Sequence, residues 1–245
     1  MRFRVLVLSA AALLGVAGTA QAADPTVYAA ASLTETFPRI DPEARFSFGG
    51  SNTLTFQIRQ GAPADVFASA APSFTQELFR DGLVERPVFL AFNRLALIVP
   101  RSNPAGIDSV YDVNRDGLKL VIANSRVPVG TYTRTVLRNL GLSAALRNVV
   151  SQETDVKSVI GKVALGQADA GFAYVTDARA AASELRSVSI PVFAQPKVRY
   201  EIAVVKGAAN TTEARAFVRR ATGPRGRRVL AQAGFRFSAA TPKAR

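Results

Sequence analysis

Apolar runs alternate with amphipathic stretches along most of the chain. Several runs are almost continuously apolar, as in RLALIVP (94–100), which is typical of strands buried on both faces of a parallel sheet. The runs that predict strands fall at 26–30, 45–48, 65–69, 94–100, 118–124, 169–174 and 200–207. The stretches that predict helices fall at 53–60, 72–82, 130–141, 155–167, 212–223 and 224–234.

The order of these elements predicts the fold class. Proline near the start and glycine past the end punctuate a helix, as Pro72 and Gly82 do here. Repeated strand–helix alternation predicts an α/β protein with mostly parallel sheets flanked by helices. In such sheets ligands bind at the carboxyl ends of strands, where helices begin. The polar loop RSNPAGIDS, after Pro100, indicates a boundary between two lobes.

The first 22 residues have the pattern of a secretory signal peptide: a basic start (MRFR), an apolar run and the small-residue site AQA, which predicts cleavage after Ala22. A membrane anchor is the weaker interpretation, because the run is short and ends in small residues and Gln21. The chain has no cysteine, so no lipid can be attached at a new cysteine N-terminus. We therefore expect a free protein of the periplasm.

The amino-acid composition limits the kinds of catalytic and metal site that the chain can form. The absence of histidine and cysteine excludes catalytic triads that use them and nearly all zinc or copper sites. The formal net charge is +13, with the basic residues mostly scattered, which indicates a solvated basic surface or a field that attracts anions. A nucleic-acid binder is a further alternative from charge alone, but no recognisable motif supports it and the compartment is wrong.

Small polar groups and helix starts gather at the predicted strand ends. Ser32 and Ser51 follow the first two strands, VPVG around Val129 and the DV pair at Val156 each precede a helix, and Tyr174 ends a strand. Helix N-termini carry free N–H groups and a partial positive charge, so several that converge form an anion site. Taken singly, each serine is as consistent with a helix cap, Tyr174 with a core tyrosine, and both valines with core residues.

Several segments occur in the order and spacing of one known family. They are VYAAASLTETF, FGGSNTLTFQIRQGAPADVFASA, VPVGTYTRTVLRNLG, DVKSVIGKVALGQADAGFAYVTDA and EIAVVKG. Over essentially the whole mature chain the sequence resembles the periplasmic molybdate-binding proteins, the soluble receptors of molybdate ABC transporters. It departs from their pattern in its first helix, LTETFPRI, which is short and broken by Pro38.

The resemblance implies a two-lobed type II periplasmic binding protein with the ligand cleft between the lobes. We expect a first lobe from residues 23–100, a second from 101–200, and a return through 201–245 with helices that pack back on the lobes. The family pattern implies that the hydroxyls of Ser32, Ser51 and Tyr174 and the backbone N–H groups of Val129 and Val156 hold the oxyanion through its oxygens. The resemblance also implies a monomeric receptor, not an enzyme, that needs no cofactor, captures molybdate or tungstate and delivers it to a membrane permease.

The donor set suits an unprotonated tetrahedral dianion, which needs donors and no acceptor. Phosphate carries a proton near neutral pH and would favour a carboxylate, and Asp155 is the nearest candidate, although a helix cap is its simpler role. Sulfate stays open as an alternative ligand, since only cavity size separates it from molybdate. A secreted carboxylate-based hydrolase is an alternative of another class, but the chain shows no paired-acid motif and no G-x-S-x-G elbow.

Overall fold

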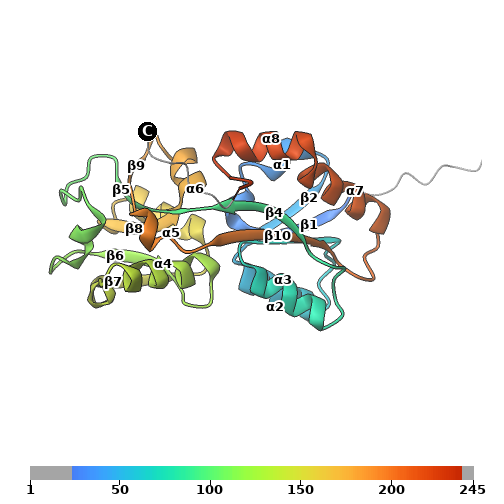
Figure 1. Cartoon of the computed structure of the whole chain (residues 1–245), viewed down its shortest axis with the longest axis horizontal. Coiled ribbons are helices and arrows are strands. Elements are labelled where there is room, and N and C mark those ends of the chain that lie inside the picture. The colour runs from blue at the N-terminus through green and yellow to red at the C-terminus, as the bar shows by residue number, and fades with distance from the viewer. Residues whose placement is uncertain (1–23, 239–245) are drawn as a thin grey trace, which may run out of the picture.

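A computed structural model describes residues 24–238, and within them the chain forms two sheets, each of five strands (Figure 1). The predicted signal peptide, residues 1–22, and the expected first mature residue, Ala23, lie outside the described residues. In spatial order the first sheet contains β2 (Arg45–Gly49), β1 (Thr26–Ala30), β3 (Val66–Ser69), β10 (Val198–Val204) and β4 (Val88–Asn93). The second contains β7 (Val149–Glu153), β6 (Leu120–Ala123), β8 (Ala170–Tyr174), β5 (Leu95–Pro100) and β9 (Leu185–Val188).

Both sheets are mixed. Strands β2, β1 and β3 run parallel, as do β7, β6 and β8, and these pairs hold the predicted parallel core of each sheet. Antiparallel strands complete the sheets: β10 between β3 and β4 in the first, and β5 between β8 and β9 in the second. All six residues of β5 are buried, as its continuous apolar run predicts.

Helices cover both sheets. In the first lobe, α1 (Phe37–Ile40), α7 (Thr211–Thr222) and α8 (Pro224–Ala233) lie on one side, and α2 (Ser51–Arg59) and α3 (Pro72–Arg80) on the other (Figure 1). In the second lobe, α4 (Pro128–Asn139), α5 (Val156–Ala164) and α6 (Val175–Ala180) pack on the sheet. The short 3₁₀ helices are η1 (Ala31–Leu33), η2 (Val110–Asn114), η3 (Ser143–Asn148) and η4 (Val192–Ala194). Among the described residues, no helix combines the length and apolar character needed to cross a bilayer.

The chain passes between the sheets at two places that lie side by side. The first is Arg94, between β4 and β5, and the second is the segment from η4 to β10 (Figure 1). The Gln195 side chain joins the two crossings, because it accepts from the Leu95 N–H at 2.9 Å and donates to the Leu95 carbonyl at 2.8 Å. The sheet change therefore lies at Arg94, ahead of the loop after Pro100 where the sequence indicated a boundary.

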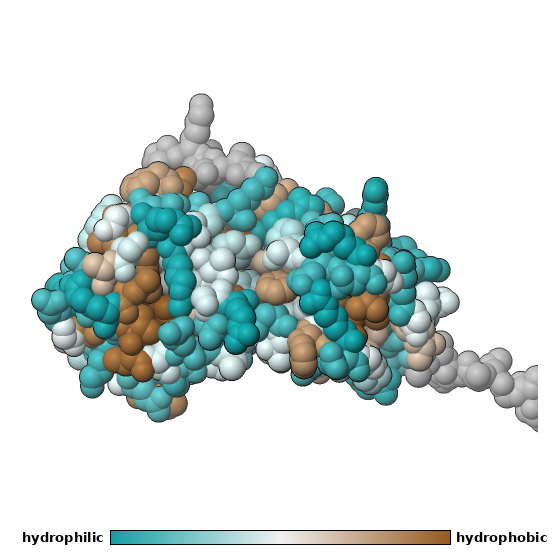
Figure 2. All heavy atoms as spheres, turned by 90° about the horizontal axis from the view of Figure 1, so that it is seen from below, coloured by the Kyte–Doolittle hydropathy of each residue, from teal (hydrophilic) through white to brown (hydrophobic). Residues whose placement is uncertain are grey.

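The surface is mainly hydrophilic on the side that carries α2, α3 and α4, with apolar patches on both lobes (Figure 2). Exposed large apolar residues include Phe56 on α2 and Phe193 on η4. Pro38 stands in the first turn of α1, where a proline is tolerated, so it starts that short helix instead of breaking a longer one.

Candidate functional site

The five residues predicted to bind an anion line one small cavity between the two sheets. This interlobe cavity has a volume of about 20 Å³, little more than the roughly 10–15 Å³ that a single water requires. It therefore suits a ligand of very few atoms. Its walls are Ala30, Ala31, Ser32, Gly49, Gly50, Ser51 and Ala70 from the first lobe, and Val127, Pro128, Val129, Asp155, Val156 and Tyr174 from the second.

Each wall segment lies where a strand ends and a helix begins, which is the position expected for a ligand site in an α/β sheet. On the first-lobe side, η1 follows β1 without a break and buries Ser32, whose Oγ lies 2.7 Å from the Tyr200 hydroxyl oxygen. Either hydroxyl can donate in this contact. When Tyr200 donates, the Ser32 proton is available to a ligand in the cavity.

Ser51 is the first residue of α2, two positions before the predicted start of that helix at 53, and its side chain does not cap the helix. Gly50 occupies the N-cap position, so Ser51 is already the first helical residue. Its buried Oγ instead accepts from the Ala70 N–H at 3.1 Å, at the end of β3. The interpretation of Ser51 as a cap is therefore wrong, and among the described residues nothing accepts its hydroxyl proton.

On the second-lobe side the donors are backbone groups. Val129 is the second residue of α4, after Pro128, and Val156 is the first residue of α5. The N–H groups of a first turn have no acceptor within the helix. Gly130 lets α4 start directly above β6, since a Cβ there would lie 2.1 Å from the Asn124 carbonyl oxygen.

Tyr174 ends β8 and is the most unusual group of the cavity. The residue is 2% exposed, and its hydroxyl has no hydrogen-bond partner among the described residues. A buried hydroxyl without a partner costs about 1–3 kcal/mol. Burial raises the pKa of the Tyr174 hydroxyl well above its usual value, so the group keeps its proton and can donate it in a hydrogen bond.

The charges around the cavity suit an anion without a proton. Among the described residues no lysine or arginine lines it, and Asp155 is the one acidic residue that does. The Asp155 carboxylate accepts from the Ser158 N–H at 3.0 Å and from the Ser158 hydroxyl at 3.1 Å, so the predicted cap role is confirmed. The N-termini of α2, α4 and α5 add partial positive charge. The cavity therefore offers neutral donors, and its one carboxylate already accepts hydrogen bonds from Ser158.

The two lobes touch each other around this cavity. A Cβ on Gly50 would lie 2.4 Å from the Thr154 carbonyl oxygen, so only glycine fits between the lobes there. The Tyr132 hydroxyl, on α4, donates to the Ala70 carbonyl at 3.3 Å, and burial raises the pKa of that hydroxyl to about 12. Tyr132 was not among the predicted site residues, although its position two residues after VPVG could have drawn attention to it.

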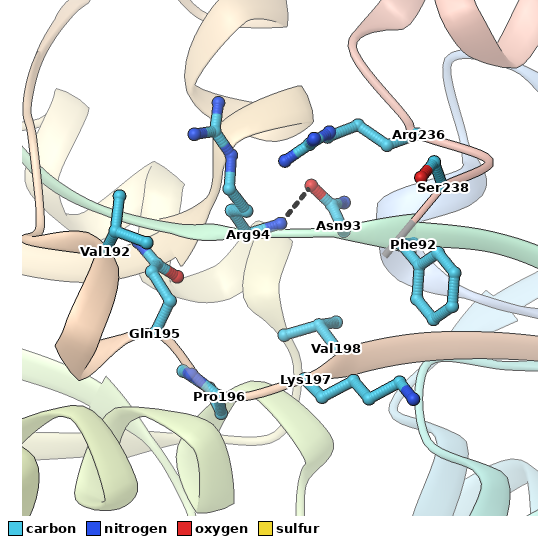
Figure 3. A pocket seen from close by; sticks show the side chains of 10 residues that line it. All are labelled: Phe92, Asn93, Arg94, Val192, Gln195, Pro196, Lys197, Val198, Arg236 and Ser238. Atoms are coloured by element: carbon cyan, nitrogen blue, oxygen red, sulfur yellow. Dashed lines mark hydrogen bonds between the residues drawn. The ribbon is translucent and has the colours of Figure 1, made fainter. Parts of the chain in front are cut away.

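A second cavity, of about 260 Å³, lies at the chain crossings (Figure 3). The side chains of Arg94 and Arg236 extend on the same side of the crossing strand, and Lys197 lies apart from them. Burial and the positive charges of Arg236 and Arg179 lower the pKa of Arg94. None of the five predicted residues lines this cavity, which offers charged groups instead of buried neutral donors.

Comparison with known proteins places the chain in a family. The family described as bacterial extracellular solute-binding protein matches residues 25–236. The molybdate-binding protein ModA of Mycobacterium tuberculosis is 38% identical over 219 residues, which cover 85% of this chain and 83% of that protein.

Two solved structures share the fold. The periplasmic molybdate-binding protein of Azotobacter vinelandii superposes with a TM-score of 0.78 at 23% identity, covering 88% of this chain and all of that one. The sulfate-binding protein SubI of M. tuberculosis superposes with a TM-score of 0.75 at 17% identity, covering 86% of each chain. Identities this low show the fold alone, and that fold confirms the predicted two-lobed periplasmic binding protein. The chain belongs to the family of bacterial extracellular solute-binding proteins.

Proposed function

We propose that this protein is a periplasmic receptor that captures molybdate, and tungstate with it, between its two lobes and delivers the anion to the permease of an ABC transporter. The observation that carries the proposal is the convergence of neutral donors from both lobes on one small cavity with no cation and no free carboxylate. The similarity to ModA over most of the chain supports molybdate as the ligand.

Each donor has a defined role in the proposal. The hydroxyls of Ser32, Ser51 and Tyr174 donate to oxyanion oxygens, and the backbone N–H groups of Val129 and Val156 complete the shell. The unpartnered Tyr174 hydroxyl supports this arrangement, because a bound oxyanion would give it the acceptor that the protein itself does not provide. The protein acts as a monomer in this proposal, because one chain supplies both walls of the cavity. It needs no cofactor, since recognition requires only hydrogen bonds.

Sulfate is the second candidate ligand. It carries the same charge and no proton, and a sulfate-binding protein shares this fold. A carboxylate-based hydrolase has no support at the cavity, where Asp155 is the one acid among the described lining residues and already caps α5. Selectivity between molybdate and sulfate therefore rests on how well each anion fills the cavity.

Thermal unfolding tests the proposal. A ligand present at a hundredfold excess over its dissociation constant adds about 2.7 kcal/mol of stability, which raises the Tm of a chain of this size by roughly 5–11 °C. We expect this rise with sodium molybdate or tungstate and a smaller rise with sodium sulfate at equal concentration. Equal shifts with sulfate and molybdate would leave a general oxyanion receptor, and no shift with any of these anions would contradict the proposal.

A further inference from the structure

A lysine beside the interlobe cavity joins two carboxylates from different lobes. The Lys157 Nζ lies 3.2 Å from Oε1 of Glu35 and 3.3 Å from Oδ1 of Asp177. Lys157 and Asp177 belong to α5 and α6 of the second lobe, and Glu35 follows η1 in the first lobe. The Lys157–Asp177 pair thus lies within one lobe, and the Lys157–Glu35 pair spans the cleft.

The three charged residues are placed by the same segments that carry the candidate donors. Glu35 stands three positions after Ser32, Lys157 directly follows Val156, and Asp177 stands three positions after Tyr174. Glu35 and Asp177 also line, together with Ser32, a further cavity of about 210 Å³. The ion pairs therefore involve the same segments as the proposed oxyanion donors, and α5 packs against η1, so a movement of either element moves both the donors and the ion pairs.

Asp177 is the group that makes this cluster more than a surface ion pair. Its side chain is 1% exposed, and among the described residues its one ion-pair partner is Lys157, whose Nζ is not aligned for a hydrogen bond to either carboxylate oxygen. Burial raises the pKa of Asp177 to about 6, while the charge of Lys157 opposes that rise. At neutral pH the carboxylate is ionised, and its negative charge raises the pKa of the Tyr174 and Tyr200 hydroxyls. The charge of Asp177 therefore acts on Tyr174, which lines the interlobe cavity.

We propose that Lys157 is a positioning residue with two effects on oxyanion capture: it neutralises the buried Asp177 carboxylate, which would otherwise repel the bound anion, and it latches the closed lobes through Glu35. The proposal rests on the proposed function, because the latch matters only if an anion occupies the interlobe cavity. The charged groups around Asp177 are Lys157 on α5, Asp155 at the N-cap of α5, Glu35 after η1, and Arg39 and Arg179, which line the same further cavity.

The Lys157–Glu35 pair, which spans the cleft, predicts an effect on the dissociation rate. Glu35 and Lys157 are 56% and 31% exposed, and exposed ion pairs of this kind contribute little. Glu35→Gln should therefore speed molybdate dissociation only about two- to fivefold and leave association unchanged, measured by stopped-flow. The control is Glu43→Gln, which removes the same charge from an exposed site without an ion pair among the described residues, and both of its rates should equal those of the parent.

The Lys157–Asp177 pair predicts that Asp177→Asn restores the molybdate affinity that Lys157→Gln loses. At about pH 8, above the pKa of Asp177, Lys157→Gln leaves a buried negative charge and should weaken molybdate binding at least fivefold more than Glu35→Gln does, in calorimetry. Lys157→Gln combined with Asp177→Asn removes both charges and leaves only the loss of the Glu35 pair, so its affinity should return to within about twofold of that of Glu35→Gln. Lys206→Gln, a lysine exposed far from the cavity, controls for net charge. A loss in Lys157→Gln that Asp177→Asn does not rescue would overturn the proposal, as would no loss at all.

Measurements without anion separate this proposal from the proposed function. The carboxyl carbon of Asp177, followed by NMR, should titrate near pH 6 in the parent and at a higher pH in Lys157→Gln. Equal pKa values in the two proteins would overturn the neutralisation of Asp177 by Lys157. If the parent binds neither molybdate nor sulfate, the proposed function fails. The latch is then decided by small-angle scattering of the anion-free protein, in which Glu35→Gln should give a larger radius of gyration than Glu43→Gln, and equal radii would refute it.

Discussion

Removing one hydroxyl, that of Tyr174, tests the proposed oxyanion shell with little disturbance of the packing. Tyr174→Phe keeps the ring, which packs edge-on against Tyr200 at 5.8 Å between centroids. A hydrogen bond to a charged partner contributes about 1.5–3 kcal/mol, so loss of this donor should raise the dissociation constant for molybdate by roughly tenfold to 150-fold. Isothermal titration calorimetry measures that change directly.

The same substitution should not destabilise the anion-free protein. The Tyr174 hydroxyl has no hydrogen-bond partner among the described residues, so phenylalanine loses no bond and relieves an unsatisfied polar group. We expect the free energy of unfolding, measured with urea, to be equal to that of the parent or higher. Tyr111→Phe is the matched control, since this tyrosine is 49% exposed and lines none of the three cavities described above, and it should change neither quantity. Parent-like molybdate affinity in Tyr174→Phe would refute the assignment of this donor.

Three further predictions follow from the same contacts. Ser51→Ala leaves the buried Ala70 N–H without its acceptor, so the free energy of unfolding should fall by about 1–3 kcal/mol and molybdate affinity should fall at least tenfold; a loss of stability alone would limit Ser51 to a structural role. Gly50→Ala places a methyl group against the Thr154 carbonyl, which should weaken binding at least tenfold with an unchanged free energy of unfolding, and unaltered affinity would show that the lobes need not meet there. Added salt should slow association more than it speeds dissociation, because screening acts on exposed charges; stopped-flow rates in which dissociation alone responds would point to a charged ligand residue.

The elements that the sequence predicts well are those whose apolar pattern has no competing explanation. Strands β1, β3 and β5 are buried runs bounded by turn residues, and all three form close to the expected positions. Strand β4 was missed because only the continuously apolar run from Arg94 on was predicted as a strand. The half-buried Val88–Asn93 forms a separate strand in the other sheet. Strand β7 was missed because its residues are half-buried or exposed, which gives no continuous apolar run.

The site shows the same division between local signals and tertiary contacts. The helix cap at Asp155 was predictable, because a cap depends only on residues within one turn. The partner of Ser51 was not, because the Ala70 N–H comes from the loop after β3, 19 residues along the chain, and only the fold brings it within reach. Val129 and Val156 carry no chemical signal in their side chains, so the resemblance to a family and not the residue type drew attention to them. The buried Asp177 carboxylate has no sequence signature at all.

Calorimetric titration of the purified mature protein with molybdate, tungstate, sulfate and phosphate tests the central claim most directly. An interlobe cavity of neutral donors that selects its ligand by fit predicts binding of one molybdate or one tungstate per chain, with sulfate at least tenfold weaker and phosphate weaker still for want of a free acceptor. No heat of binding with molybdate, or sulfate bound as tightly as molybdate, would contradict the account.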